Sequence, residues 1–370
     1  MRFKENDLRE FGSLIEKILA GDDLSEQQAY EAFVQVLSER QPELNQGAFL
    51  AALRAKGENV DEIAGCWRAI MDLDTVNVEI NSGKMLVENC GTGMDRIKTF
   101  NISTASAIVA SSLGVPMARH GARAITSNSG TVDMAEALGV DVECSVEVVK
   151  QSIEKSNIGL FNGMSVNVHP GGLFRILKHI RFGSILNIAA SLANPASPRV
   201  GVRGVYDDSL LDSVASLMNK LGYEKGIVYT GFDSVCKNSM DEVSTMGITR
   251  VVEFDNGDRS SYTLSPEDMK IPLDTYEDIK PLQNFEDEIA EFLKAFTDPS
   301  HSSRVNAICA NTAPILYVCG RSGDYVEGAA MARDAIMSGK ALEQLKLWVM
   351  TQNRDPEKGI RILEKRLASI

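Results

Sequence analysis

Residues 88–106 read ENCGTGMDRIKTFNISTAS, and this stretch predicts a strand, a glycine loop and a helix in succession. The apolar run at residues 85–87 indicates a short buried strand. After it, Gly91 and Gly93 are expected to let the backbone turn with positive φ and come close to a ligand. The pattern therefore presents backbone amides at the carboxyl end of a strand.

The helix that follows carries its own start and stop signals. Ser103 or Thr104 is expected as its N-cap, and Gly114 as its end. A strand, a glycine loop and a helix N-terminus make a phosphate site, because the amides point at the anion and the helix dipole favours its charge. The loop matches neither a Walker loop nor a GxGxxG fingerprint, which disfavours ATP-loop and dinucleotide sites.

Composition and charge limit the class of protein. The chain has 370 residues, 44% hydrophobic and 24% charged, which is typical of a soluble globular protein with one large domain or two. No apolar run approaches a membrane span, and the N-terminus is unlike a secretory leader. Six scattered cysteines without a CxxC pair argue against zinc and disulfides and indicate a reducing cytoplasm. A net charge of −13 disfavours nucleic-acid binding, so local amides, metal and selected basic residues must meet an anionic substrate.

The chain divides by pattern near residue 78. Before it the sequence predicts helices, one of them opened by the capping box SEQQ at residues 25–28. From residue 85 onward, short apolar runs expected as strands alternate with helical patterns, which predicts an α/β architecture. Examples of these runs are residues 115–118, 227–230 and 315–318. Asn-Gly at the centre of residues 255–258 indicates a hairpin turn.

Four motifs follow one another in the chain: GTGMD at 91–95, TFNISTASA at 99–107, RHGAR at 119–123 and SNSG at 127–130. They resemble GTGGD, NxST, KHGNR and SxSG of the anthranilate phosphoribosyltransferase family, in the same order and at similar spacing. Further similar segments extend over nearly the whole chain. They are LAGDDLS at 19–25, AALRAKG at 51–57, DEIAG at 61–65, His169-Pro170, Asn194-Pro195, Gly204-Val-Tyr206, MDEVS at 240–244 and GKAL at 339–342.

The resemblance implies an α/β fold with a small N-terminal helical domain and a larger α/β domain, whose central mixed sheet is flanked by helices. The helical domain is expected at residues 1–78, joined by a segment near 171–195, and the α/β domain at 79–170 and 196–370. The active site is expected in the cleft between them. By the same resemblance, the N-terminal helices are expected to form a homodimer.

The activity that the resemblance implies is transfer of the 5-phosphoribosyl group from phosphoribosyl pyrophosphate to an aromatic amine, with release of pyrophosphate. Anthranilate, in tryptophan biosynthesis, is the expected acceptor, and Mg²⁺ the expected cofactor. Neither nucleic acid nor a membrane is expected as a partner, and the expected location is the cytoplasm.

The resemblance also assigns site residues. Those expected to bind the substrates are Gly91, Thr92, Gly93, Asp95, Thr99, Asn101, Ser103, Thr104, Arg119, His120, Ser127, Ser129, His169 and Arg175. Ser103, Asp241 and Glu242 are expected to bind Mg²⁺, which prefers hard oxygen ligands beside phosphate. From the residues alone, two adjacent carboxylates are also typical of a solvated surface, and a histidine such as His120 of a packed core.

The chain departs from the family pattern mainly where the acceptor is expected. Met94 replaces the second loop glycine, and Ala122 replaces the asparagine of KHGNR, which removes a polar contact. The family also has an arginine that receives the carboxylate of anthranilate. Arg175, Lys178 and Arg181 are all candidates for it, because the segment is about two residues shorter than the family pattern.

Three alternatives remain beside transfer to anthranilate. The first is the same donor chemistry on a different aromatic or heteroaromatic amine, and Met94 and Ala122 leave it open. The second is a nucleoside phosphorylase-like attack by inorganic phosphate, which the NxST and Asp-Glu motifs disfavour. The third is a binding protein that keeps a phosphate pocket without catalysis. The retained Asp241-Glu242 pair disfavours it, because an inert pocket has no use for metal ligands.

Overall fold

The structure is a computed structural model that describes residues 3–81, 83–92, 97–124, 130–180, 182–298 and 301–370. It contains two compact units. One comprises Met1–Asn77 and Gly163–Ser197, and the other comprises Val78–Asn162 and Pro198–Ile370. The first unit is helical and the second combines a mixed sheet with helices, which confirms the predicted fold class.

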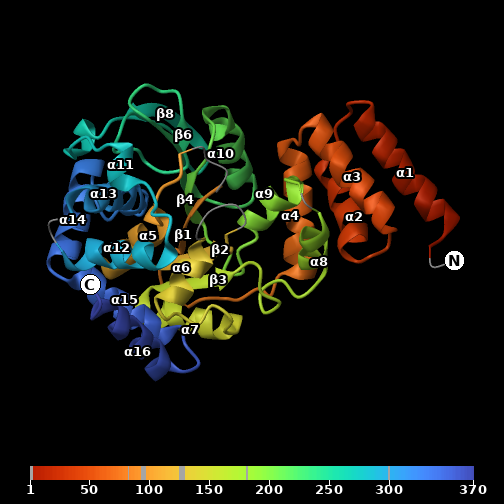
Figure 1. Cartoon of the computed structure of the whole chain (residues 1–370). Helices are drawn as coiled ribbons and strands as arrows, with labels where there is room; N and C mark the ends of the chain where they lie inside the picture. Colours follow the sequence, from red (N-terminus) through yellow and green to blue (C-terminus); the bar gives the residue numbers. More distant parts are fainter. Residues whose placement is uncertain (1–2, 82, 93–96, 125–129, 181, 299–300) are drawn as a thin grey trace. The chain divides into compact units, whose positions relative to one another are not determined.

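The helical unit is built from two groups of helices that are distant in the sequence. They are α1 (Glu5–Leu19), α2 (Glu26–Leu37), α3 (Glu43–Lys56) and α4 (Val60–Asp74), and later α8 (Gly172–His179) and α9 (Ile185–Leu192) (Figure 1). The capping box predicted at Ser25 and Gln28 is confirmed at the start of α2. A second box, which the sequence analysis missed, joins Asn59 and Glu62 at the start of α4. Local polar side chains therefore satisfy the free amides that begin these helices.

The second unit is organised by one mixed sheet. Its strands are β1 (Val87–Gly91), β2 (Met117–Gly121), β3 (Ile158–Asn162), β4 (Val200–Gly204), β5 (Lys225–Phe232), β6 (Ser239–Met240), β7 (Thr249–Asp255) and β8 (Asp258–Leu264). The order is β3-β2-β1-β4-β5-β7-β8, with β6 paired to β5. The first five strands in this order are parallel, whereas β6, β7 and β8 pair antiparallel. The predicted hairpin is confirmed, with Asp255 opposite Asp258 and with Asn256 and Gly257 at positive φ between them.

The strand order reverses direction at β1. The chain runs outward from β1 through β2 to β3, and then resumes at β4 on the other side of β1. Open α/β sheets bind ligands at such a reversal, because the connections on either side leave a crevice at the carboxyl ends of the strands. In β1 and β4 those ends are Gly91 and Gly204, which lie opposite each other in the register.

Helices complete the second unit on both faces of the sheet. They are α5 (Ile102–Ser112), α6 (Thr131–Ala137), α7 (Val146–Ser156), α10 (Leu211–Lys220), α11 (Tyr276–Ile279), α12 (Phe285–Thr297), α13 (Ser302–Val318), α14 (Tyr325–Met337), α15 (Lys340–Thr351) and α16 (Pro356–Leu367), with 3-10 turns at Asp208–Leu210 and Glu267–Met269. Gly201 faces α10, whereas its neighbours Val200 and Val202 join the core that contains α5 and α13. Because side chains alternate along a strand, α10 covers the opposite face. None of the helices in the described ranges is long and apolar enough to cross a bilayer.

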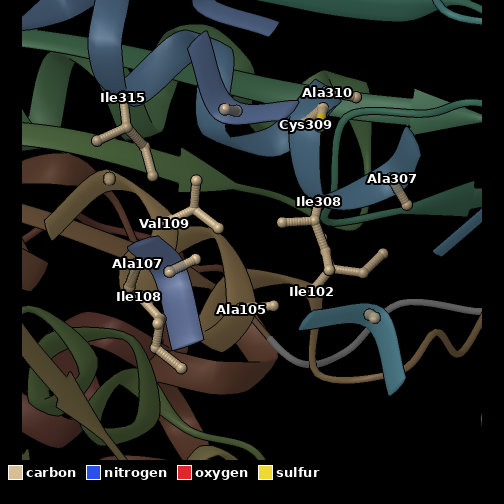
Figure 2. Packing of buried hydrophobic residues seen from close by; sticks show 14 of the residues in the cluster. Ile102, Ala105, Ala107, Ile108, Val109, Ala307, Ile308, Cys309, Ala310 and Ile315 are labelled. Atoms are coloured by element: carbon tan, nitrogen blue, oxygen red, sulfur yellow. The ribbon is translucent and has the colours of Figure 1, made fainter. Parts of the chain in front are cut away.

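One expected strand is a helix. The run at residues 315–318 forms the end of α13, which is buried along almost its whole length. Figure 2 shows Ile315 and Ile308 of this helix packed against α5 among small residues, Ala107 and Ala310 for example. A short apolar run has no period that separates a buried strand from a buried helix, so the sequence pattern could not distinguish the two.

The boundaries around the first glycine loop also differ from the expectation. The strand begins at Val87, where the predicted run ends, and continues through Gly91. The helix begins at Ile102, so neither Ser103 nor Thr104 is its N-cap, and Asn101 occupies that position without a side-chain cap bond. Gly114 has a positive φ just after the end of the helix, as expected. Gly91 does not have the positive φ that the sequence predicted. Gly91 therefore serves close approach and not a turn.

The C-terminal helices cover an edge of the sheet. The strand β3 is an edge strand, and the side chain of Gln352, which follows α15, occupies the place of a further strand. Its Oε1 accepts from the Leu160 amide at 2.8 Å, and its Nε2 donates to the Leu160 carbonyl at 2.8 Å. Oε1 also accepts from Trp348 Nε1 at 2.9 Å. Covering an edge strand removes a template for pairing with other chains, which gives this segment a structural role.

We expect Gln352→Ala to destabilise the larger unit by about 3 kcal/mol, because it leaves two buried backbone groups and an indole N–H without partners. Trp348 reports this region, so urea unfolding is to be followed by its fluorescence in a Trp67→Phe background, which removes the other of the two tryptophans. Gln283→Ala, in the loop before α12, is the control and should change stability by less than about 0.5 kcal/mol. Equal stability of both variants would contradict the role of Gln352.

Candidate functional site

The central feature at the carboxyl end of the sheet is the guanidinium of Arg119 on β2. Its Nε donates to Asn89 Oδ1 at 3.0 Å, its Nη1 to Thr104 Oγ1 at 2.9 Å, and its Nη2 to Ser103 Oγ at 3.2 Å. The strand β1 and the first turn of α5 thus supply all three acceptors. The side chain is buried, with 2% of the residue exposed.

The charge of Arg119 is not neutralised at contact distance. Within the described ranges, every hydrogen-bond acceptor of this guanidinium is uncharged, and no carboxylate forms an ion pair with it. Burial lowers the pKa of Arg119, while the more distant carboxylates of Glu242 and Glu88 act in the opposite direction. An arginine keeps its charge even so. A buried cation that is not paired is costly unless an anion joins it, so this position favours an anionic ligand.

Ser103 and Thr104 therefore act differently from helix caps. Their hydroxyls accept hydrogen bonds from Arg119, and the carbonyl of Ser103 accepts from Asn89 Nδ2 at 2.8 Å. These contacts join the first turn of α5 to β1 and β2. Asn101 precedes the helix, and Thr99 lies in the half-buried loop before it. This loop is anchored by hydrogen bonds from the amides of Ile97 and Phe100 to residues 239 and 279.

The carboxylates of the site lie where β1 and β4 end. Asp241 follows β6 and packs against both Gly91 and Gly204, so closely that a Cβ at Gly91 would overlap its carboxylate and one at Gly204 its carbonyl. Both strands must end in glycine for Asp241 to occupy this place. Asp241 and Glu242 are both buried, which excludes the solvated acidic surface that the sequence left open.

Buried polar side chains hold this carboxylate pair in position. Asn311 of α13 accepts from the Val243 amide at 2.7 Å and donates to the Val243 carbonyl at 3.0 Å. Ser244 donates to the Phe232 carbonyl at 2.7 Å, and its amide donates to Thr249 Oγ1 at 2.9 Å. The backbone beside the carboxylates is thus fixed from two sides, as a preorganised site requires.

The oxygen atoms around the pair suit a small hard cation together with phosphate. No group of three or more histidine, cysteine, aspartate or glutamate side chains among the described residues could hold a metal. Proteins commonly bind magnesium with only one or two carboxylates, because phosphate groups of the substrate supply further ligands. Beside them, Thr92 Oγ1 is buried with no hydrogen-bond partner in the described part of the chain, and so remains available to a ligand.

Arg123 is not available to a phosphate, although the sequence places it beside Arg119. Its guanidinium contacts carboxylates of Asp133 at 3.2 Å, Glu136 at 2.7 Å and Glu143 at 3.3 Å. The hydrogen bonds that Arg123 donates to Glu136, followed by the contacts with the other carboxylates, raise the pKa of Arg123. His120 is buried on β2 opposite Phe161. Alternation along the strand turns it away from the face on which Arg119 lies.

In the helical unit, the end of α4 organises the His-Pro-Gly-Gly segment. Nδ1 of His169 lies 2.7 Å from the Asp74 carbonyl oxygen and must donate its proton there, since a carbonyl only accepts. Burial lowers the pKa of His169, so the imidazole is neutral at pH 7 and Nε2 is its acceptor. The Asp74 carboxylate accepts from the amides of Gly171 and Leu173 at the start of α8.

Of the candidates for binding an acceptor carboxylate, Arg175 is engaged within the helical unit. Its Nη2 donates to the Val36 carbonyl at 3.1 Å and to Gln46 Oε1 at 3.2 Å, and its Nε lies 3.1 Å from a carboxylate oxygen of Glu39. Lys178 is exposed on α8, and Arg181 lies outside the described residues. The role expected of Arg175 stays a prediction.

Four other expected site residues, Gly93, Asp95, Ser127 and Ser129, lie outside the described residues, as does Met94. The structure in turn adds residues that the sequence analysis missed, namely Asn89, Gly204 and Asn311. Gly204 lies within a segment that resembles the family, so its position carried a signal, although its contacts did not. Asn89 carried no such signal. Asn311 carried a weak signal, as one of several polar residues among the apolar residues of α13.

Comparison with known families places both parts of the chain. Residues 83–342 match the family model described as the glycosyl transferase family, a/b domain. Residues 12–73 match the glycosyl transferase family, helical bundle domain. The two matches follow the order of the two units.

Curated relatives are similar over most of the chain. Anthranilate phosphoribosyltransferase of Geobacillus stearothermophilus is 36% identical over 334 residues, which are 90% of this chain and 96% of the relative. The enzyme of that name from Methanosarcina acetivorans is 37% identical over 331 residues, 89% of this chain and 86% of its own.

Solved structures with that name share the fold. The crystal structure from Thermus thermophilus superposes with a TM-score of 0.81 at 28% identity, covering 91% of this chain and 98% of its own. The structure from Saccharomyces cerevisiae in complex with PRPP and Mg has a TM-score of 0.79 at 22% identity, covering 93% and 98%.

We expect inorganic pyrophosphate to raise the melting temperature of the parent protein but not that of Arg119→Met, because the ligand binds the folded state through the buried cation. The variant is itself expected to be less stable, because Asn89, Ser103 and Thr104 lose their donor. The comparison is therefore of the shift that pyrophosphate adds to each protein's own melting temperature. Lys225→Met removes one positive charge at the start of β5 and serves as the control. If pyrophosphate raises the melting temperature of Arg119→Met as much as that of Lys225→Met, Arg119 does not form an anion site.

Proposed function

The chain belongs to the glycosyl transferase family of the anthranilate phosphoribosyltransferases, and we propose that it transfers the 5-phosphoribosyl group of phosphoribosyl pyrophosphate to anthranilate in tryptophan biosynthesis. The observation that carries the proposal is the buried guanidinium of Arg119, held by Asn89, Ser103 and Thr104 at the carboxyl end of the sheet. A polyphosphate supplies the anion that this cation lacks at contact distance.

The reaction breaks the bond between the ribose anomeric carbon and a pyrophosphate oxygen and forms one from that carbon to the amine nitrogen, which then loses a proton. Positive charge develops on the ribose and negative charge on the leaving group. The protein therefore needs donors for the pyrophosphate more than it needs a nucleophile. An aromatic amine is neutral and nucleophilic at pH 7, so the transfer does not require a strong base to activate it.

Magnesium is the cofactor that the site chemistry favours. Asp241 and Glu242 would hold it, with Ser103 as a further oxygen ligand, and phosphate oxygens would complete the coordination. Bound magnesium supplies positive charge that stabilises the departing pyrophosphate. The support is the fit of Asp241 against Gly91 and Gly204, which reserves this place for a carboxylate. The yeast enzyme of similar fold is described in complex with PRPP and Mg.

The remaining donor contacts are proposed from the motifs. Thr92, with its buried hydroxyl, and Gly91 belong to the phosphate loop, and Thr99 and Asn101 lie in the segment that leads to α5. Gly93, Asp95, Ser127 and Ser129 complete the set by resemblance alone. His120 and His169 are proposed to line the site through their backbone or ring, and Arg175 to meet the acceptor.

The assembly and location are also proposals. The helical unit exposes large apolar side chains, with Leu44 of α3 at 86% and Leu19 of α1 at 62%. Such side chains on several helices support a homodimer formed by this unit, which sedimentation equilibrium would test. All six cysteines are free, which supports a reducing cytoplasm as the location.

We expect Asp241→Asn with Glu242→Gln to lower pyrophosphate release at saturating donor by at least about 100-fold, because charge on the leaving group is no longer balanced. The assay contains phosphoribosyl pyrophosphate, anthranilate and magnesium, and chelation of magnesium should abolish the parent activity as well. Glu286→Gln with Asp287→Asn removes the same two charges from the first turn of α12 and is the control. Parental turnover in the first variant would refute the metal assignment.

We expect Met94→Gly with Ala122→Asn to raise kcat/KM for anthranilate by about tenfold, because the variant regains a polar contact and space that the family pattern has near the acceptor. The donor KM should change little. Other aromatic and heteroaromatic amines are assayed in parallel, with parent and variant compared for each. If the parent already uses anthranilate as well as the variant does, these two positions do not set the choice of acceptor.

A further inference from the structure

The C-terminal segment that follows α15 contacts the turn at residues 139–143, although it lies beyond residue 342, where the family match ends. The amide of Asp141 donates to the Gln352 carbonyl at 3.0 Å, and Asn353 Nδ2 donates to the Gly139 carbonyl at 2.7 Å. Gly139 has a φ of +99°, and a Cβ there would overlap the backbone of Gly359. The segment is thus seated closely on this turn.

Arg354 provides the charged contact of this segment. Its Nε and Nη2 donate to the two carboxylate oxygens of Asp141 at 2.5 and 3.0 Å. The Arg354 side chain is 63% exposed, and that of Asp141 only 14%. The pair borders a pocket of about 520 Å³, so truncation of Arg354 opens no void in the core. Its removal is therefore expected to leave the fold intact.

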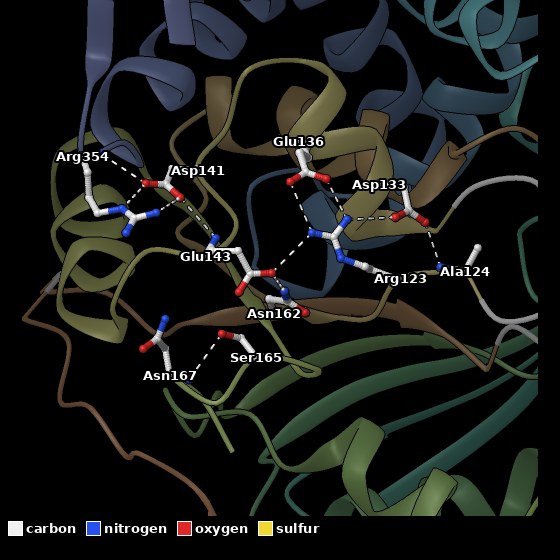
Figure 3. A network of polar contacts seen from close by, with 10 residues as sticks. All are labelled: Arg123, Ala124, Asp133, Glu136, Asp141, Glu143, Asn162, Ser165, Asn167 and Arg354. Atoms are coloured by element: carbon white, nitrogen blue, oxygen red, sulfur yellow. Dashed lines mark hydrogen bonds and ion pairs between the residues drawn. The ribbon is translucent and has the colours of Figure 1, made fainter. Parts of the chain in front are cut away.

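A chain of polar contacts leads from this pair to the backbone at Ala124 (Figure 3). Within the turn at residues 139–143, the amide of Glu143 donates to Asp141 Oδ1 at 3.2 Å. The Glu143 carboxylate in turn contacts Arg123 at 3.3 Å and accepts from Asn162 at the end of β3 at 2.9 Å. Arg123 then reaches Glu136 and Asp133 of α6.

Asp133 closes this chain on the backbone. Its Oδ2 accepts from the amides of both Ala124 and Gly130, at 2.8 and 2.9 Å. One carboxylate oxygen therefore joins two points of the chain that are six residues apart. The first of them lies five residues after Arg119, in the segment that leads out of β2.

We propose that Arg354 is a positioning residue for donor binding, and that it acts through Asp141, Glu143, Arg123 and Asp133 on the backbone at Ala124 and Gly130. The proposal rests on the proposed function for its kinetic consequence. Without Arg354 this backbone has more freedom, and the donor must order it on binding. Ordering costs affinity, but at saturating donor the ordered state is restored. The donor KM therefore rises while kcat is preserved.

The test measures kcat and the KM of phosphoribosyl pyrophosphate for the full chain and its variants. Arg354→Ala should raise this KM about threefold with little change in kcat, as expected for loss of a partly exposed ion pair. Arg354→Lys, which keeps the charge but only one contact, should fall between. Arg361→Ala is the matched control, since Arg361 is 65% exposed, lies in the same C-terminal segment and pairs only with Glu357 among the described residues.

Two further measurements separate this link from a purely structural effect. Amide hydrogen exchange at Ala124 and Gly130, without ligand, should be faster in Arg354→Ala than in Arg361→Ala. The KM of the double variant Arg354→Ala with Arg123→Ala should equal that of Arg123→Ala alone, because both act through one path. The proposal is overturned if the two substitutions raise the donor KM by the product of their separate effects. It is also overturned if the amides of Ala124 and Gly130 exchange equally fast in Arg354→Ala and Arg361→Ala.

The kinetic outcome also distinguishes the proposal from the function beneath it. If the parent turns over the donor normally and Arg354→Ala has the KM of Arg361→Ala, the positioning role is wrong and the proposed function stands. If the parent neither binds nor turns over phosphoribosyl pyrophosphate, the proposed function is wrong, and the role in donor binding falls with it. The exchange measurement reports on the polar chain in both cases.

Discussion

A positive charge buried at the carboxyl end of a parallel sheet is the constraint around which this molecule is organised. Arg119 cannot leave its place, because Asn89, Ser103 and Thr104 accept from its three donor nitrogens, and all three belong to β1 or to the start of α5. Those neutral acceptors orient the guanidinium without cancelling its charge. A chain with a net charge of −13 thus contains a local cation, at which we propose that an anionic substrate binds.

The negative part of the site depends on the absence of side chains. Asp241 approaches the ends of β1 and β4 only because Gly91 and Gly204 lie opposite each other there. Asn311, which lies 68 residues after Val243 in the sequence, then fixes the backbone next to Asp241 by pairing with Val243. Arg119 and the carboxylates lie, without contacting each other, near the reversal of strand order, where the connections of the sheet diverge and a ligand commonly binds.

The C-terminal segment has two physical roles in this arrangement. Gln352 replaces a neighbouring strand for Leu160 and so closes the edge of the sheet at β3. Directly after it, Arg354 binds the turn that carries Asp141. A segment needed to protect an edge therefore lies where it can also affect the backbone that follows β2. Stability and substrate binding are connected here by neighbouring residues of one loop.

The sequence by itself determined what depends on local interactions. The capping box at Ser25 and the Asn256-Gly257 turn were predictable because each involves residues only a few positions apart. The family motifs likewise predict site roles for Arg119, Asp241 and Glu242, and these roles stay predictions. Tertiary structure alone decided which of the two arginines of the RHGAR motif has a carboxylate partner. Arg123 pairs with Glu136 and Glu143, whereas Arg119 donates only to neutral acceptors among the described residues. It also decided that residues 315–318 are helical and that Gly91 serves close approach. Such outcomes depend on contacts between residues far apart in the chain, whose free energies no local pattern contains.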